Sequence, residues 1–211
     1  MKKFLSIAVV FVLVFSMCPA VFAAEELSPN TQALYQQYEQ IIAEANEEYN
    51  CSLFLVPYEE MEDFCSIEEF RERVFEYCEY RNVPFTHSEG IVTGGQSARE
   101  NRVVTVPCIR RKTYPQDTII ATFYGTFDVR MKVNGMYYIA SQSFTVYTRS
   151  ENGYYSAIVE GNPTVRTVDG GRTINVTQQL AIYVQGQFGE NTSVTATYIM
   201  NFGNGNITAS S

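Results

Sequence analysis

The run TIIATFYGTFDVRMKVNGMYYIASQSFTVYT, residues 118–148, decides how the chain is read. Apolar and polar residues alternate along its first half with a period of two, which is typical of a strand with one buried face. Asn134-Gly135 then favours a two-residue type I′ turn, because both central residues of that turn need a positive φ. We predict one long β-hairpin whose first strand buries Ile119, Ala121, Phe123, Gly125, Phe127, Val129, Met131 and Val133.

A type I′ turn also fixes which residues of the two strands face each other. The turn pairs Val133 with Met136 and, further along, Phe127 with Gln142. The remaining predicted pairs are Met131/Tyr138, Val129/Ala140, Gly125/Phe144 and Phe123/Val146. Both members of each pair are apolar or glycine except Gln142, which we expect at a bulge or beside a buried polar partner. The opposite face carries Tyr124, Tyr137 and Tyr147.

Residues 1–23 have the features of an export signal. Lys2-Lys3 precede a short apolar run, and Val21-Phe22-Ala23 supplies the small residues that a signal peptidase reads. The segment resembles the Sec signal peptides of Gram-positive bacteria. The alternative, a membrane-spanning helix, normally needs about 20 apolar residues, which is longer than this run. We expect a secreted, extracellular bacterial protein with no membrane contact after cleavage.

Charge divides the remaining chain. Residues 24–100 contain 17 acidic and 4 basic residues, whereas residues 101–211 contain 6 acidic and 9 basic residues. This change predicts two parts whose opposite charges favour docking. An acidic protein without a basic stripe is also a poor candidate for binding nucleic acid.

The acidic part, residues 24–83, has helical patterning. Ser28-Pro29 opens one apolar repeat of helical spacing, and Ser66-Ile67-Glu68-Glu69 is a capping box before a second. A short apolar burst at residues 51–56, which ends before Pro57, predicts one strand between them. Residues 84–100 lack periodicity and are predicted to be a linker or a long loop.

Residues 101–203 read as β-structure throughout. Pro107, Glu151-Asn152-Gly153, Gly161-Asn162-Pro163 and Asp169-Gly170-Gly171 separate about seven alternating segments. The predicted fold is therefore α+β: an acidic helical segment of two helices and one short strand, then an antiparallel β-sandwich or open barrel. Residues 204–211 are small and polar, and we expect them to form a tail.

Four cysteines remain after the signal segment: Cys51, Cys65, Cys78 and Cys108. An even number in an exported chain suggests two disulfides. A bridge between Cys65 and Cys78 is disfavoured, because the helix between them separates the two residues by roughly 20 Å. Pairing Cys51–Cys65 with Cys78–Cys108, or Cys51–Cys78 with Cys65–Cys108, remains open, and unbridged thiols are the alternative.

Signatures of catalysis are weak in this sequence. His87 is the only histidine, and neither a Gly-x-Ser-x-Gly elbow nor a phosphate-binding glycine loop is present. The acidic pairs near residues 59–69 fit a solvated helix start better than a glycosidase cleft or a calcium loop. We predict no cofactor and no metal site.

Tyrosine is abundant, with 15 residues against no tryptophan. Exposed tyrosines stack on sugars and anchor protein interfaces, so Tyr124, Tyr137 and Tyr147 are the candidate binding residues. The leading hypothesis is a non-catalytic binding or adhesion module for a protein or glycan. The alternatives are a hydrolase with a carboxylate or Cys-His site, and a structural or inhibitor-like protein.

Overall fold

The structure is a computed structural model that describes residues 29–88 and 101–210. The predicted signal peptide and most of the predicted linker lie outside the described residues. The chain divides into two compact units, Met1–Gln36 and Gln37–Ser211. The described part of the first unit is the opening of one helix, and every contact described below lies within the second.

The acidic segment contains two helices and one short strand between them. Helix α2 spans Pro29–Tyr49, strand β1 spans Leu53–Leu55, and helix α3 spans Ile67–Tyr80, with a 3-10 turn at Tyr58–Glu60. The hydroxyl of Ser66 accepts a hydrogen bond from the Glu69 N–H at 3.1 Å, so the predicted cap of α3 is confirmed. The buried stripe of α3 consists of Phe70, Val74, Tyr77 and Cys78.

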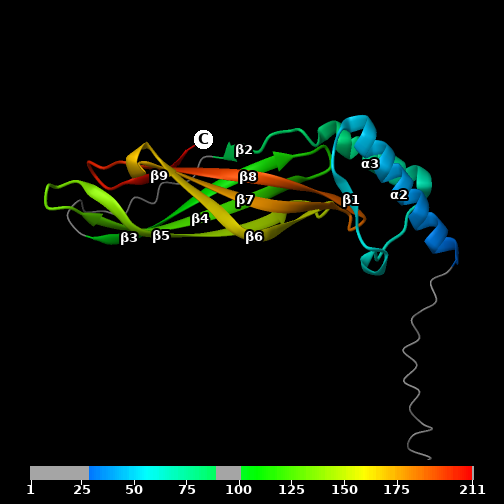
Figure 1. The fold of residues 1–211 in the computed structure, drawn as a ribbon, viewed down its shortest axis with the longest axis horizontal. Helices are drawn as coiled ribbons and strands as arrows, with labels where there is room; N and C mark the ends of the chain where they lie inside the picture. The colour runs from blue at the N-terminus through cyan, green and yellow to red at the C-terminus, as the bar shows by residue number, and fades with distance from the viewer. Residues whose placement is uncertain (1–28, 89–100, 211) are drawn as a thin grey trace, which may run out of the picture. The chain divides into compact units, whose positions relative to one another are not determined.

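Two antiparallel sheets make up the rest of the described chain, and neither closes into a barrel. One sheet has the order β2-β3-β4-β5, and the other has the order β1-β8-β7-β6 with β9 also paired to β8. Figure 1 separates most of the strands by colour, with β3 and β4 in green and β6 to β9 in yellow to red. The strands are β2 (Thr86–Ser88), β3 (Arg102–Thr113), β4 (Thr118–Met131), β5 (Tyr137–Ser150), β6 (Tyr155–Val168), β7 (Thr173–Val184), β8 (Phe188–Met200) and β9 (Ile207–Ser210).

One core joins the two sheets, as expected of a β-sandwich. Phe123, Phe127 and Val129 of β4 are fully buried with Tyr198 of β8, whose hydroxyl donates to the Phe123 carbonyl at 3.2 Å. The buried parity predicted for β4 is therefore confirmed over residues 119–129. It is wrong for Met131 and Val133, which lie at the exposed end of the hairpin.

The turn of the long hairpin differs from the prediction. The Gly135 N–H donates to the Lys132 carbonyl at 2.9 Å, and Gly135 has a φ of +79° whereas Asn134 has no positive φ. This is a three-residue loop, in which a type I turn is followed by a left-handed glycine, and not a type I′ turn. Met131 consequently pairs with Tyr137 and not with Tyr138.

A bulge then restores the predicted register. The pairing shifts by one residue between Asp128 and Val129, where Ser141 and Ile139 are successive partners and Ala140 is skipped. Beyond this point Phe127 faces Gln142 and Phe123 faces Val146, as predicted. The two irregularities cancel, because each moves the register by one residue in opposite senses.

Two predicted strand breaks are absent. Strand β3 continues through Pro107, which pairs with Tyr124 of β4 on one side. Proline is tolerated there because it supplies no N–H, and β2 borders β3 only at residues 109–111. Strand β6 continues past Gly161 with a register shift between Glu160 and Thr164, so the predicted break is a bulge.

The predicted polar tail is also partly strand. Ile207–Ser210 forms β9, which pairs with residues 197–200 of β8, and Ile207 is buried. Alternation over only four residues, among small polar neighbours, is too weak a signal to predict a strand.

Helix α3 packs against strand ends and the connections beside them. The ring of Tyr77 lies 5.8 Å from both Tyr114 and Phe188 and 6.1 Å from Tyr155, between ring centroids. Tyr114 precedes β4, Phe188 opens β8 and Tyr155 opens β6. The buried stripe of α3 therefore covers this end of the strands and leaves the outer face around Tyr124 uncovered.

Candidate functional site

Two of the three candidate tyrosines lie together on the outer face of the β2-β3-β4-β5 sheet. Tyr124 faces Thr145 in the ladder, and Tyr147 faces Thr122, so the two rings are diagonal neighbours on adjacent strands. Their centroids are 5.9 Å apart at an interplanar angle of 75°, an edge-to-face contact. Their exposed fractions are 40% and 61%, which leaves both rings available for contact.

Hydroxyl groups surround this tyrosine pair. Thr126 continues the same face of β4 and contacts the hydroxyl of Thr105 on β3 at 3.1 Å. Ser143 faces Thr126 from β5. The surface therefore combines rigid aromatic rings with small hydrogen-bonding groups, a composition that recurs in antibody paratopes.

Tyr137 does not join this surface, which corrects the prediction that all three tyrosines share one face. It is 4% exposed and belongs to the core, and its backbone N–H donates to the Phe202 carbonyl at 2.9 Å. The reason is the bulge in β5, which reverses the parity of every β5 residue on the turn side of Ala140. Its ring lies over Gly205, where an added Cβ would come within 2.8 Å of it.

A cavity of about 430 Å³ opens near this displaced tyrosine. It lies between the first half of β5 and the β6–β7 turn, with Phe202 and Ile174 among the apolar lining residues and Gln142 and Thr167 among the polar ones. The Lys132 ammonium lies 5.5 Å from the centroid of Tyr138, a cation–π contact at the rim. Sequence analysis missed this cavity, because its walls depend on the bulge and the three-residue loop.

The Cys-His pair of the hydrolase alternative exists, but it is not built for nucleophilic attack. The Cys108 Sγ lies 4.0 Å from Nδ1 of His87, because β2 places His87 opposite Arg110 on β3. Cys108 is fully buried in the core, and burial raises the pKa of its thiol, which favours the unreactive protonated form. Because Cys108 has no exposed surface, a substrate cannot reach its thiol in this arrangement.

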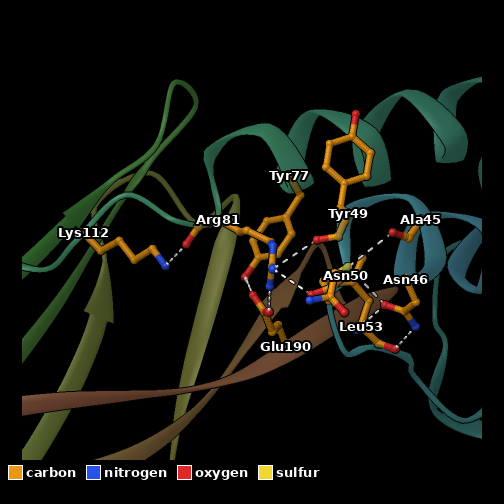
Figure 2. A network of polar contacts seen from close by, with 10 residues as sticks. Ala45, Asn46, Tyr49, Asn50, Leu53, Tyr77, Arg81, Lys112 and Glu190 are labelled. Atoms are coloured by element: carbon orange, nitrogen blue, oxygen red, sulfur yellow. Dashed lines mark hydrogen bonds and ion pairs between the residues drawn. The ribbon is translucent and has the colours of Figure 1, made fainter.

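A polar network joins α3 to the sheets (Figure 2). The Arg81 guanidinium contacts Oε1 of Glu190 on β8 at 2.5 Å and also donates to the carbonyls of Tyr49 and Asn50. The Tyr77 hydroxyl donates to the same Glu190 carboxylate at 3.3 Å. Arg81, Tyr77 and Glu190 each have a partner within the network, although Nε of Arg81 is buried without one, and we interpret these contacts as structural.

Lys112 extends this network from β3. Its Nζ donates to the Arg81 carbonyl at 2.5 Å, just past the last turn of α3, where the helix dipole favours a cation. Burial lowers the pKa of Lys112, and the nearby Glu190 carboxylate opposes that effect.

Among the described residues, no group of three or more His, Cys, Asp or Glu side chains is arranged to hold a metal ion.

The two-disulfide framework is not present, since all four described cysteines are unbridged. Cys65 lies beside the β7–β8 turn, where the Gln187 amide donates to its Sγ at 3.4 Å. Cys108 lies in the middle of β3 within the core. One open pairing joins Cys65 to Cys108, and the other joins Cys65 to Cys51 and Cys108 to Cys78. Neither set of two bridges is present in the structure.

In the described part of the chain, no helix is sufficiently long and apolar to cross a bilayer. Comparison of the chain with models of protein families, with curated proteins and with solved structures gives no match.

Proposed function

We propose that this protein is a secreted, non-catalytic binding or adhesion module that engages an extracellular protein or glycan through Tyr124 and Tyr147. The observation that supports it is the exposed edge-to-face pair on a face that α3 leaves uncovered. Export is proposed from residues 1–23, whose charged, apolar and small-residue stretches follow each other in signal-peptide order.

The chemistry of the surface favours recognition over turnover. Two tyrosine rings fixed against each other lose little conformational freedom on binding, and the neighbouring hydroxyls of Thr122, Thr126 and Thr145 donate or accept hydrogen bonds. A surface of tyrosine and threonine suits a protein ligand, and the same rings stack on a sugar ring if the ligand is a glycan.

Neither alternative has an equal observation behind it. The hydrolase requires an accessible nucleophile, whereas the Cys108 thiol is sealed in the core beside His87. The structural or inhibitor-like reading depends on a rigid loop within residues 84–100, of which residues 89–100 lie outside the described chain.

The test compares a variant that lacks both rings of the pair with a variant that lacks one exposed tyrosine ring elsewhere. Tyr124→Ala/Tyr147→Ala should lose at least roughly tenfold in affinity for whatever ligand the unmodified protein captures on arrays of glycans and extracellular proteins. Tyr80→Ala is the matched control, because Tyr80 has 39% exposure but lies on α3. Far-UV circular dichroism establishes that each variant is folded. Unchanged binding by the folded double variant, or an equal loss with Tyr80→Ala, would exclude this surface.

A further inference from the structure

Cys51 and Cys78 belong to neighbouring elements that the helix contacts hold side by side. Cys51 follows the end of α2, and Cys78 lies in the last turn of α3. The Arg71–Glu44 ion pair at 2.7 Å and the edge-to-face contact of Tyr49 with Phe75 join the last turns of α2 to α3. The contact therefore continues toward the C-terminal ends, where the two cysteines are found.

Arg81 brings the contact to the cysteines themselves. It follows Cys78 by three residues, and its guanidinium donates to the carbonyls of Tyr49 at 3.4 Å and Asn50 at 3.2 Å, directly before Cys51 (Figure 2). Residues three apart in a helix share one face. The face of α3 that carries Cys78 is thus the face that meets the end of α2 directly before Cys51.

The backbone around Cys51 is held in place. Asn50 has a φ of +48°, which ends α2, and the Cys51 N–H donates to the Asn46 carbonyl at 3.2 Å. The Asn46 side chain accepts from the Leu53 N–H at 2.7 Å and donates to the Leu53 carbonyl at 2.9 Å, so it holds the chain two residues after Cys51. The Cys51 thiol itself donates to Oδ1 of Asn46 at 3.2 Å.

We propose that Cys51 and Cys78 are a dithiol that oxidation converts to one intramolecular disulfide, while Cys65 and Cys108 remain thiols. The bridge would close a loop that contains β1, whose edge pairs with β8. It would therefore fix both helices and the attached strand to the sheet.

With oxidised glutathione as the oxidant, the reaction balances. The half-buried Cys51 attacks the glutathione disulfide as a thiolate and releases one glutathione thiol. Cys78 then attacks the Cys51 sulfur and releases the second glutathione, so two protein thiols are oxidised and one disulfide is reduced. Burial raises the pKa of the Cys78 thiol, so little of it is ionised at neutral pH and the closing step should accelerate as the pH rises from neutral to mildly alkaline.

The experiment incubates the folded full chain with oxidised glutathione and maps its peptides without reduction. The expected product has lost two hydrogen atoms and contains one linked peptide pair that joins Cys51 to Cys78. The melting temperature should rise by roughly 10 °C relative to the reduced protein, because the bridge constrains the unfolded chain. Cys51→Ser should remove both changes, and Cys65→Ser should retain both.

Two results would overturn the proposal. One is a bridge that includes Cys65 or Cys108, and the other is a glutathione adduct at Cys51 that never closes onto Cys78. Cys51→Ser is the preferred variant, since Cys51 is half-buried and its replacement disturbs packing less than that of Cys78, which is 3% exposed.

Discussion

Replacing Asp117 with asparagine should destabilise the fold in a way that depends on pH. Asp117 lies between β3 and β4, is 3% exposed, and receives five hydrogen bonds. The donors are the Ser150 hydroxyl and the backbone N–H groups of Thr118 at 2.7 Å, Asn152 at 2.8 Å, Tyr155 at 3.0 Å and Glu151 at 3.1 Å. One carboxylate therefore joins the start of β4 to the β5–β6 connection.

The size of the effect follows from the pKa of Asp117. Burial alone would raise that pKa, but the hydrogen bonds from Ser150 and the backbone outweigh burial and lower it from 3.8 to about 2. The difference corresponds to about 2 kcal/mol of unfolding free energy. This contribution is fully present above the unfolded pKa, near pH 4, and is lost as the pH falls through the folded value, near pH 2.

Asp117→Asn should therefore reduce the unfolding free energy by about 2 kcal/mol at pH 7. The amide places an NH₂ group where the carboxylate accepted two hydrogen bonds. Ser150 can rotate its hydroxyl to accept from that group, but the Tyr155 N–H loses its acceptor. The difference from the unmodified protein should shrink below pH 4 and disappear near pH 2.

Urea unfolding followed by circular dichroism at several pH values between 2 and 7 measures this difference. Asp128→Asn is the matched control, because Asp128 is also paired, with Arg130 at 2.7 Å, but on the surface. We expect the control to change the unfolding free energy by less than about 0.5 kcal/mol. A cost for Asp117→Asn that is equally large at pH 2 and pH 7 would refute the electrostatic reasoning.

Two further substitutions test the core and the polar network. Gly125→Ala should lower the unfolding free energy by about 2 kcal/mol, because the new Cβ would come within 2.7 Å of the Phe127 ring and 3.0 Å of the Tyr198 ring; thermal unfolding measures it, and an unchanged melting temperature would show that the rings move freely. Glu190→Gln should lower the unfolding free energy by about 3 kcal/mol at pH 7, because Arg81 and Lys112 then share a buried region without a carboxylate between them. Urea unfolding measures this loss. A loss below about 0.5 kcal/mol would show that solvent already screens these charges.

The buried face of the long hairpin was predictable because it depends on alternation alone. The sequence places Phe123 and Phe127 on the same side of β4 whatever the turn does, and the sheets pack through them. The cap of α3 was equally predictable, since the Ser66 hydroxyl accepts from the backbone N–H of Glu69, which is only three residues away.

The tyrosine surface was only partly predictable, for a reason that lies in the turn. The identity of Asn134-Gly135 does not distinguish a type I′ turn from a type I turn with a left-handed glycine, since Gly135 has a positive φ in both and asparagine tolerates either sign of φ. The choice moves Tyr137 from the surface into the core, and Ala140 carries no local signal for the bulge that compensates. Tyr124 and Tyr147 kept their face because they lie beyond the bulge.

Net charge gives the wrong account of how α3 attaches to the sheets. The acidic segment was expected to dock through its negative charge onto the more basic β part. The ion pair across this contact has the opposite polarity, because Arg81 comes from the acidic segment and Glu190 from β8. The aromatic contacts of Tyr77 and Phe70 with Phe188 bury the apolar stripe of α3 and fix its position. Local partners and apolar burial therefore decide the docking, and the excess of acidic side chains remains on the solvent side, where charge costs little.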